Sequence, residues 1–148
     1  MDRPDVLLRA IEAAAAEHRQ NQLDSCCFFL KKTESPIEAA MYVALAQACR
    51  SLNNIVSFEP QVQIGAYRAD FVLTSDAQRL VVECDGHDFH ERTKRQAARD
   101  RARDRSMLEA GYQVMRFTGS EIYADAMACA RQAVEHVEKL AHAVRCGE

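Results

Sequence analysis

The sequence lacks the features that mark several classes of small protein. Its six cysteines form no CxxC or CxxH spacing, so neither a zinc site nor a disulfide framework is indicated. No apolar run reaches the length of a signal-peptide core or a membrane span, and the chain opens with charged residues. We therefore expect the cysteines to be small core residues of a cytoplasmic protein in a reducing compartment that does not engage membranes.

Linkers, internal repeats and low-complexity segments are absent as well. The 148 residues, 48% of them apolar, fit a single domain over residues 1–148 with one hydrophobic core. Aromatic residues make up only 7% of the chain and form no rich platform for stacking bases. The net charge of −3 argues against a protein that coats nucleic acid through bulk charge.

Positive charge is nevertheless concentrated in one segment. Residues 91–105 hold seven lysines or arginines against three acids, a local charge of +4. Since the whole chain has a net charge of −3, the remaining residues carry −7. In a helix, Arg95, Arg99 and Arg103 would form a column of like charges at four-residue spacing, and phosphates would stabilise such a column. The helix is either an ordinary solvated face or a contact to the nucleic-acid backbone.

The most informative stretch is a predicted β-hairpin. Two runs rich in Val, Leu and Phe flank residues 74–78, which form a polar turn signal. A pairing centred on this turn places Phe71 opposite Val82 and Asp70 opposite Glu83. Two carboxylates then face each other.

Opposed side chains in an antiparallel pair have Cβ atoms roughly 4.5–5.5 Å apart, and like charges there are destabilising. A proton, an intervening cationic side chain or a hard divalent cation would each offset the repulsion. The third option makes Asp70 and Glu83 a candidate Mg²⁺ site, with Mn²⁺ as a substitute. A register shifted by one residue would instead put the two acids on opposite faces of the sheet.

The rest of the pattern predicts an α/β fold. Ser35-Pro-Ile-Glu38 supplies an N-cap, a first-turn proline and a capping-box acid for a helix that ends at Asn53-Asn54. The other predicted elements are a helix over 4–21, a strand over 55–64 that is bent or at an edge because of Pro60, a helix over about 91–110 stopped by Gly111, a strand over 112–118 and a closing amphipathic helix from Ile122. Periodicity leaves residues 23–32 open between strand and helix.

The order of these elements restricts the topology. The third and fourth strands are joined through a helix, so we expect them to be parallel neighbours. The result is a four-stranded mixed sheet flanked by helices, over a core of about residues 35–145 with the 4–21 helix appended.

Several short motifs follow one another in a set order. They are Ser35-Pro-Ile-Glu38 on a helix, Tyr67-Arg-Ala-Asp-Phe71, Val82-Glu-Cys-Asp-Gly86 with histidines after it, Asp100-Arg to Asp104-Arg, Gly111-Tyr and Arg116-Phe117. Together they resemble the PD-(D/E)XK, restriction-endonuclease-like superfamily, and within it the small Vsr-like domains related to very-short-patch-repair endonucleases. The resemblance covers about residues 35–125. It implies an αβββαβ core and metal-dependent hydrolysis of a nucleic-acid phosphodiester, with DNA as the expected substrate.

The resemblance also assigns residues. Asp70 matches the metal-binding aspartate, Glu83 opens the (D/E)XK element, and Glu38 matches an acid on the preceding helix, although its capping box alone would explain it. The lysine expected two residues after Glu83 is Asp85, so the group that would orient the water or steady the developing charge is missing from its usual place. The replacements that the sequence offers are Arg68, His87, His90 and Lys94, and loss of activity is the other reading.

Three of these residues carry a second interpretation. Asp85 would lie opposite Arg68, so it is either a cross-strand ion-pair partner or part of the metal shell. His87 and His90 are either polar loop residues or a proton-transfer group. Arg116 is a candidate buried partner for a sheet carboxylate.

We therefore expect a single-domain, Mg²⁺-dependent endonuclease whose specificity comes from a protein partner or a second copy. The catalytic candidates are Asp70, Glu83, Asp85, His87 and His90, the metal candidates Asp70, Glu83 and Glu38, and the nucleic-acid contacts Arg68, Lys94, Arg95, Arg99 and Arg103. The alternatives are a catalytically inactive nucleic-acid- or protein-binding module with the same fold and a structural subunit with a buried acid pair.

Overall fold

The computed structural model of the protein describes residues 9–17, 20–21, 33–86 and 94–147. The chain divides into two units, Met1–Lys32 and Thr33–Glu148. In the first unit, residues 9–17 and 20–21 are helical, within the range predicted for the first helix. The segment 23–32, whose structure the sequence left open, lies outside the described residues.

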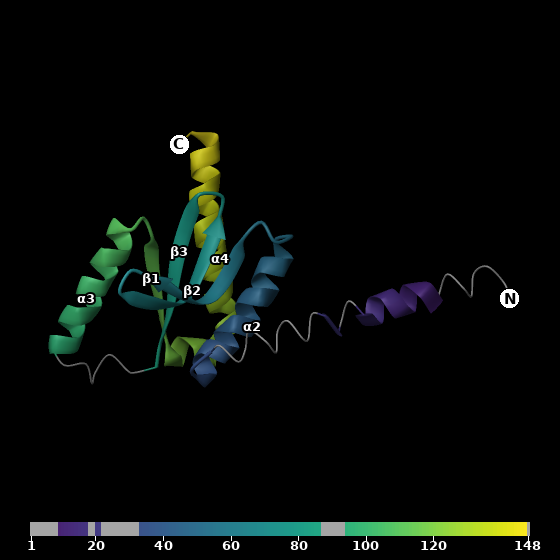
Figure 1. Cartoon of the computed structure of the whole chain (residues 1–148), viewed down its shortest axis with the longest axis horizontal. Coiled ribbons are helices and arrows are strands. Elements are labelled where there is room, and N and C mark those ends of the chain that lie inside the picture. The colour runs from purple at the N-terminus through teal and green to yellow at the C-terminus, as the bar shows by residue number, and fades with distance from the viewer. Residues whose placement is uncertain (1–8, 18–19, 22–32, 87–93, 148) are drawn as a thin grey trace. The chain divides into compact units, whose positions relative to one another are not determined.

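The second unit carries the sheet and the helices that cover it (Figure 1). Its described elements are α2 (Pro36–Ser51), β1 (Ser57–Ile64), β2 (Tyr67–Ser75), β3 (Gln78–Asp85), α3 (Lys94–Glu109), β4 (Gln113–Thr118) and α4 (Gly119–Cys146). The strands lie in the order β1-β2-β3-β4, antiparallel except for the parallel pair β3 and β4. The predicted αβββαβ order and the mixed sheet are confirmed.

The central hairpin has the predicted register as far as Phe71↔Val82, and the predicted pair of Asp70 with Glu83 lies beyond the last paired residues of β2 and β3. Phe71 pairs with Val82, Leu73 with Leu80, and a two-residue turn separates Ser75 from Gln78. Asp76 in that turn has φ 50, in the left-handed region that a short polar side chain tolerates.

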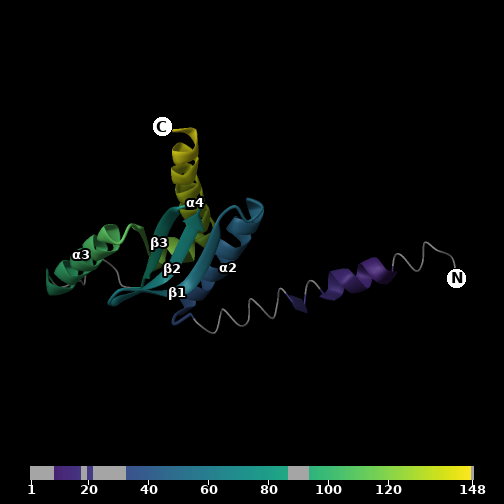
Figure 2. The ribbon, with the colours of Figure 1, turned by 45° about the horizontal axis from the view of Figure 1, so that its top comes forward.

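Helices cover both faces of the sheet. Figure 2 shows α3 on one side of the strands and α2 on the other. The α3 side is packed by Met107 against Val72, Val81 and Ala69. Because side chains alternate along a strand, Phe71, Leu73, Leu80 and Val82 point to the other face, where α2 and α4 pack together; all four are at most 1% exposed.

The ends of α2 follow from its sequence. The Ser35 hydroxyl accepts the Glu38 N–H at 3.3 Å, and proline occupies the first turn. After Leu52, Asn53 and Asn54 adopt φ 54 and 58, left-handed values that asparagine tolerates and that stop the helix. Both predicted ends are confirmed.

Strand β1 lies at the edge of the sheet, as expected for a strand that contains Pro60. Gln61 has φ 54, and the Cα pairing of β1 with β2 passes from Pro60 to Val62. The strand therefore bends directly after the proline.

The last elements also follow local signals. Gly111, with φ 87, separates α3 from β4, and Thr118 forms a capping box with Glu121 at the start of α4. Asp125 interrupts α4 with φ −161 and ψ 87, and its Oδ1 accepts the Ala128 N–H at 2.8 Å, so it caps the long second part of the helix. In the described part of the chain, no helix has both the length and the apolar character needed to cross a membrane.

The cap at Asp125 gives a test of this account of α4. Asp125→Ala leaves the Ala128 N–H without its acceptor, and we expect a loss of about 1 kcal/mol in the free energy of unfolding, measured by urea denaturation. Asp125→Asn keeps a side-chain oxygen and is the matched control. Equal stabilities of the two variants would contradict the capping role.

Candidate active site where two strands separate

The candidate site begins where the two middle strands part. The pairing of β2 with β3 runs from Ser75↔Gln78 to Phe71↔Val82, and the next residue of β2 is Asp70. The Asp70 Oδ2 accepts the Cys84 N–H at 2.8 Å, so a side chain replaces a ladder bond. Glu83 itself pairs with β4. The two acids thus lie where the hairpin opens.

Burial and neighbouring acidic charges raise the pKa of both acids. Glu83 is only 3% exposed. Desolvation on burial raises the pKa of Asp70 to about 6 despite the Cys84 N–H, which lowers it. Burial also raises the pKa of Glu83 to about 7, and the charge of Asp70 raises it further. The two carboxylates are therefore close enough to oppose each other's ionisation.

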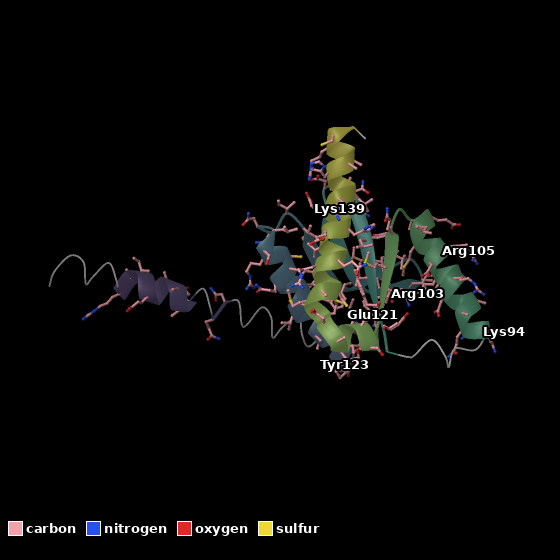
Figure 3. The ribbon with its side chains drawn as sticks, turned by 180° about the vertical axis from the view of Figure 1, so that it is seen from behind. Lys94, Arg103, Arg105, Glu121, Tyr123 and Lys139 are labelled. Atoms are coloured by element: carbon pink, nitrogen blue, oxygen red, sulfur yellow. The ribbon has the colours of Figure 1, made fainter. Side chains whose placement is uncertain are left out.

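Arg103 of α3 reaches this acid pair. Its Nη2 lies 2.8 Å from Glu83 Oε1 and 2.5 Å from the Arg68 carbonyl oxygen. Its guanidinium carbon lies 5.9 Å from the centre of the Tyr67 ring. Among the described residues, the buried Nε of Arg103 has no hydrogen-bond partner. In Figure 3, Arg103 points toward the sheet, whereas Lys94 and Arg105 point outward.

Arg103 was predicted to contact nucleic acid, and its contact with Glu83 was not predicted. A signal was present: Arg103 lies one turn before Met107, which is 1% exposed. Residues four apart share a helix face, so Arg103 faces the sheet as Met107 does.

Glu38 is 7% exposed and its oxygens are already bound. The Oε2 atom accepts the Glu34 N–H and the Gln61 side-chain amide, each at 2.9 Å, and Oε1 accepts the Ser35 hydroxyl at 3.1 Å. The expected cap thus reaches the Glu34 N–H, not that of Ser35. The charge of Glu38 also raises the pKa of Asp70, so the two acids are near each other.

Gln61 is a residue that sequence reasoning missed. Its left-handed φ of 54 directs the side-chain amide to Glu38. A non-glycine residue in this region costs energy, and such conformations gather at functional sites. The adjacent Pro60 suggested a bend, but no pattern indicated which side chain the bend would present.

A second guanidinium serves Asp85. Arg116 Nη1 lies 3.5 Å from Asp85 Oδ1, and its Nη2 lies 2.5 Å from Asp104 Oδ1. The prediction that Arg116 pairs with a sheet carboxylate is confirmed. The other interpretation, an ion pair between Asp85 and Arg68, is wrong. Arg68 forms its ion pair with Glu34, and it lies beyond the last paired residues of β2 and β3.

Three of the other predicted site residues are not brought to the acid pair. Lys94, Arg95 and Arg99 are exposed on α3. His87 and His90 lie outside the described residues. Within residues 33–86 and 94–147, no cluster of three or more His, Cys, Asp or Glu side chains is arranged to hold a metal. Of the predicted metal ligands, Asp70 and Glu83 are the two that could still hold an ion, because the oxygens of Glu38 are committed to their hydrogen bonds.

A pocket of about 360 Å³ lies between the start of α2, the end of β3 and the start of α4. Glu38 and Cys84 contribute to its wall, and the exposed Tyr123 lies at the start of α4 beside it. Gly119 lies against Asp85 and Gly86. A Cβ atom added at Gly119 would lie 3.6 Å from the Asp85 carbonyl oxygen. The end of β3 and the start of α4 are thus in close contact.

A mixed sheet with helices on both faces and an acid pair at the parting of its middle strands defines a restriction endonuclease-like domain. The comparison with protein families agrees, because residues 45–137 match REase_MTES_1575, a restriction endonuclease-like family, and the chain belongs to this family. The comparisons with curated proteins and with solved structures gave no match. The matched range contains Gln61, Asp70, Glu83 and Arg103, whereas Glu38 precedes it.

The raised pKa values predict how stability depends on pH. Folding raises the pKa of Asp70 and Glu83 from 3.8 and 4.5 to about 6 and about 7, so the folded state holds more protons than the unfolded state between these values. Stability from this pair is therefore full below about pH 4 and is lost as the pH rises through about 7, by about 3 kcal/mol for each acid.

We expect Asp70→Asn to reduce this loss, because it removes one acid and lowers the pKa of the other while keeping an acceptor for the Cys84 N–H. The free energy of unfolding, measured with urea at about pH 5 and about pH 8, tests this, and the exposed Glu109→Gln is the control with the same charge change. The same pH slope in wild type and Asp70→Asn would contradict the coupling.

Proposed function

We propose that the protein is a Mg²⁺-dependent endonuclease that hydrolyses phosphodiester bonds of DNA. The observation that carries the proposal is the buried pair Asp70 and Glu83, whose pKa values are both raised where the sheet opens. Membership of a restriction endonuclease-like family supports a nuclease-type function.

The acid pair fits a hard divalent cation. Mg²⁺ prefers oxygen ligands, keeps several waters and is commonly bound by one or two carboxylates together with substrate phosphates. Two carboxylates that resist joint ionisation are such a donor set, since a cation would relieve both desolvation and repulsion. When bound, the metal would lower the pKa of a water molecule and offset charge on the phosphate.

The surrounding residues would fix this donor set. The Cys84 N–H holds Asp70 Oδ2, so that one oxygen keeps a set position while the other remains for a ligand. Gln61 and the start of α2 hold Glu38 beside it. Arg116 ties Asp85 to Asp104, which anchors the end of β3 to α3.

The first test is a cleavage assay with Mg²⁺ or Mn²⁺ on plasmid, linear duplex, branched and single-stranded DNA and on RNA. Asp70→Ala and Glu83→Ala should each lower cleavage by at least about 100-fold, because each removes a proposed metal ligand. Calorimetric titration with Mn²⁺ should show binding to wild type that both substitutions abolish. Glu109→Gln, on the exposed end of α3, controls for charge.

Equal cleavage by wild type and Asp70→Ala would contradict the proposal and point to a contaminating nuclease. A second function, a binding module without catalysis, is favoured by one observation: the lysine position of the (D/E)XK element holds Asp85, which is engaged by Arg116. DNA binding in gel shifts without cleavage in either metal would favour that module.

The exposed basic residues at the start of α3, Lys94, Arg95 and Arg99, are the proposed backbone contact. No acid lies between Lys94 and Arg99, and phosphate contacts do not read sequence. The double variant Arg95→Gln/Arg99→Gln should weaken DNA binding about equally for unrelated sequences and reduce the slope of log affinity against log salt by roughly 2.

Fluorescence anisotropy with Ca²⁺ in place of Mg²⁺, across a series of salt concentrations, measures this slope. Arg131→Gln/Lys139→Gln on α4 removes the same charge from another helix and serves as the control. The same slope in the α3 variant and wild type would place the DNA elsewhere.

A further inference from the structure

The site has two guanidiniums, and they are committed differently. Arg116 is shared by two acids, Asp85 and Asp104. Arg103 forms an ion pair with one acid, Glu83, while its second hydrogen bond goes to the neutral Arg68 carbonyl. Among the described residues, Arg103 therefore has one acidic ion-pair partner where Arg116 has two.

We propose that Arg103 supplies the cationic group that the (D/E)XK element lacks at Asp85: it neutralises Glu83 when no metal is bound and contacts the phosphate undergoing hydrolysis when metal is bound. This inference rests on the proposed nuclease function. It names the residue that completes the site, which the sequence alone did not single out.

The geometry places Arg103 on the correct side of the sheet for this role. Glu83, Asp85 and Arg116 share the face that α3 covers, because alternate residues of β3 point to it and Arg116 pairs with Glu83 across the parallel strands. Arg103 enters that face from α3 and lies directly on Glu83 Oε1. The Arg103 guanidinium would therefore meet a phosphate bound beside Glu83 without a movement of α3.

The guanidinium keeps unused donors. The hydrogen bonds to Glu83 and to the Arg68 carbonyl both come from Nη2. Within the described residues, the buried Nε has no hydrogen-bond partner. A guanidinium offers five N–H groups in a fixed plane that matches two phosphate oxygens. The Tyr67 ring and the Arg68 carbonyl hold that plane at the mouth of the hairpin. A phosphate oxygen would satisfy the donor that the protein leaves unpaired.

Arg103 and a metal ion would compete for Glu83. Arg103 occupies Oε1 of the same carboxylate that is proposed as a metal ligand. If Asp70 and Glu83 held a divalent cation, its charge would neutralise Glu83, and the Arg103 guanidinium would then be available to the phosphate. Removing Arg103 should then leave metal binding intact and abolish only the step that needs the phosphate contact.

The test compares Arg103→Gln, Arg103→Lys and the control Arg105→Gln, which makes the same charge change on the exposed side of the same helix (Figure 3). Three quantities are measured for each: Mn²⁺ affinity by calorimetry without DNA, duplex affinity in Ca²⁺, and single-turnover cleavage in Mg²⁺. Circular dichroism and thermal unfolding establish that each variant is folded.

We expect Arg103→Gln to bind Mn²⁺ as tightly as wild type or more tightly, because a competing cation is gone, and to cleave about 100- to 1,000-fold more slowly. Arg103→Lys should recover part of that rate, since a lysine keeps the charge without the planar fork. Arg105→Gln should stay within about threefold of wild type in all three measurements, as expected for an exposed charge outside the site.

Two results would overturn the inference while leaving the nuclease function intact. One is wild-type cleavage by Arg103→Gln. The other is a tenfold or larger loss of Mn²⁺ affinity in Arg103→Gln in parallel with the loss of cleavage, which would show that Arg103 only positions Glu83. A wild-type protein that neither binds Mn²⁺ nor cleaves any substrate would instead refute the proposed function, and this inference with it.

Discussion

The site depends on the unfavourable electrostatics of two carboxylates that the sheet shields from water. A protein that needed only a stable hairpin would place apolar residues at both positions, as this chain does one step further along with Phe71 and Val82. At Asp70 and Glu83, burial raises both pKa values, the charge of Glu38 raises that of Asp70 further, and the charge of Asp70 raises that of Glu83. The folded chain therefore keeps groups that destabilise it near neutral pH. Groups with such perturbed pKa values gather at functional sites, where a ligand of opposite charge offsets their cost.

The fold creates that position by ending a strand pairing early. Strands β2 and β3 are paired up to Phe71↔Val82, after which β2 remains with β1 and β3 with β4. The Asp70 carboxylate accepts the Cys84 N–H, so the parting does not leave that donor without a partner. The left-handed Gln61 lies on the β1 side of the same opening and fixes Glu38. Strand divergence, backbone strain and acid burial are thus three consequences of one local departure from regular pairing.

Local signals in the sequence predicted most of the framework because each has its own physical cause. The polar turn set the hairpin register, and Asn53-Asn54 and Gly111 stopped their helices through left-handed backbone. Arg103 could not be placed so simply. Four residues turn a helix by 400°, so a column at four-residue spacing drifts by about 40° per step, and Arg103 lies about 80° around the helix from Arg95. That drift separates an exposed Arg95 from an Arg103 that reaches Glu83. The contact of Gln61 with Glu38 could not be predicted for another reason: the direction of the Gln61 side chain follows from a bend in β1 that no sequence periodicity encodes.

The charge balance around the acid pair links these features to ligand binding. Among the described residues, Glu38, Asp70, Glu83, Asp85 and Asp104 are coupled to only two guanidiniums, those of Arg103 and Arg116. Full ionisation would leave three uncompensated negative charges in a partly buried site, which adds to the burial that raises the pKa values of Asp70 and Glu83. A divalent cation would remove most of that excess, and the exposed positive charge of α3 lies outside it, where it cannot neutralise the acids but can meet a polyanion. The chain thus keeps its negative charge where a metal would sit and its free positive charge where a phosphate backbone would pass. Arg103 links the two regions, because it belongs to α3 and contacts Glu83.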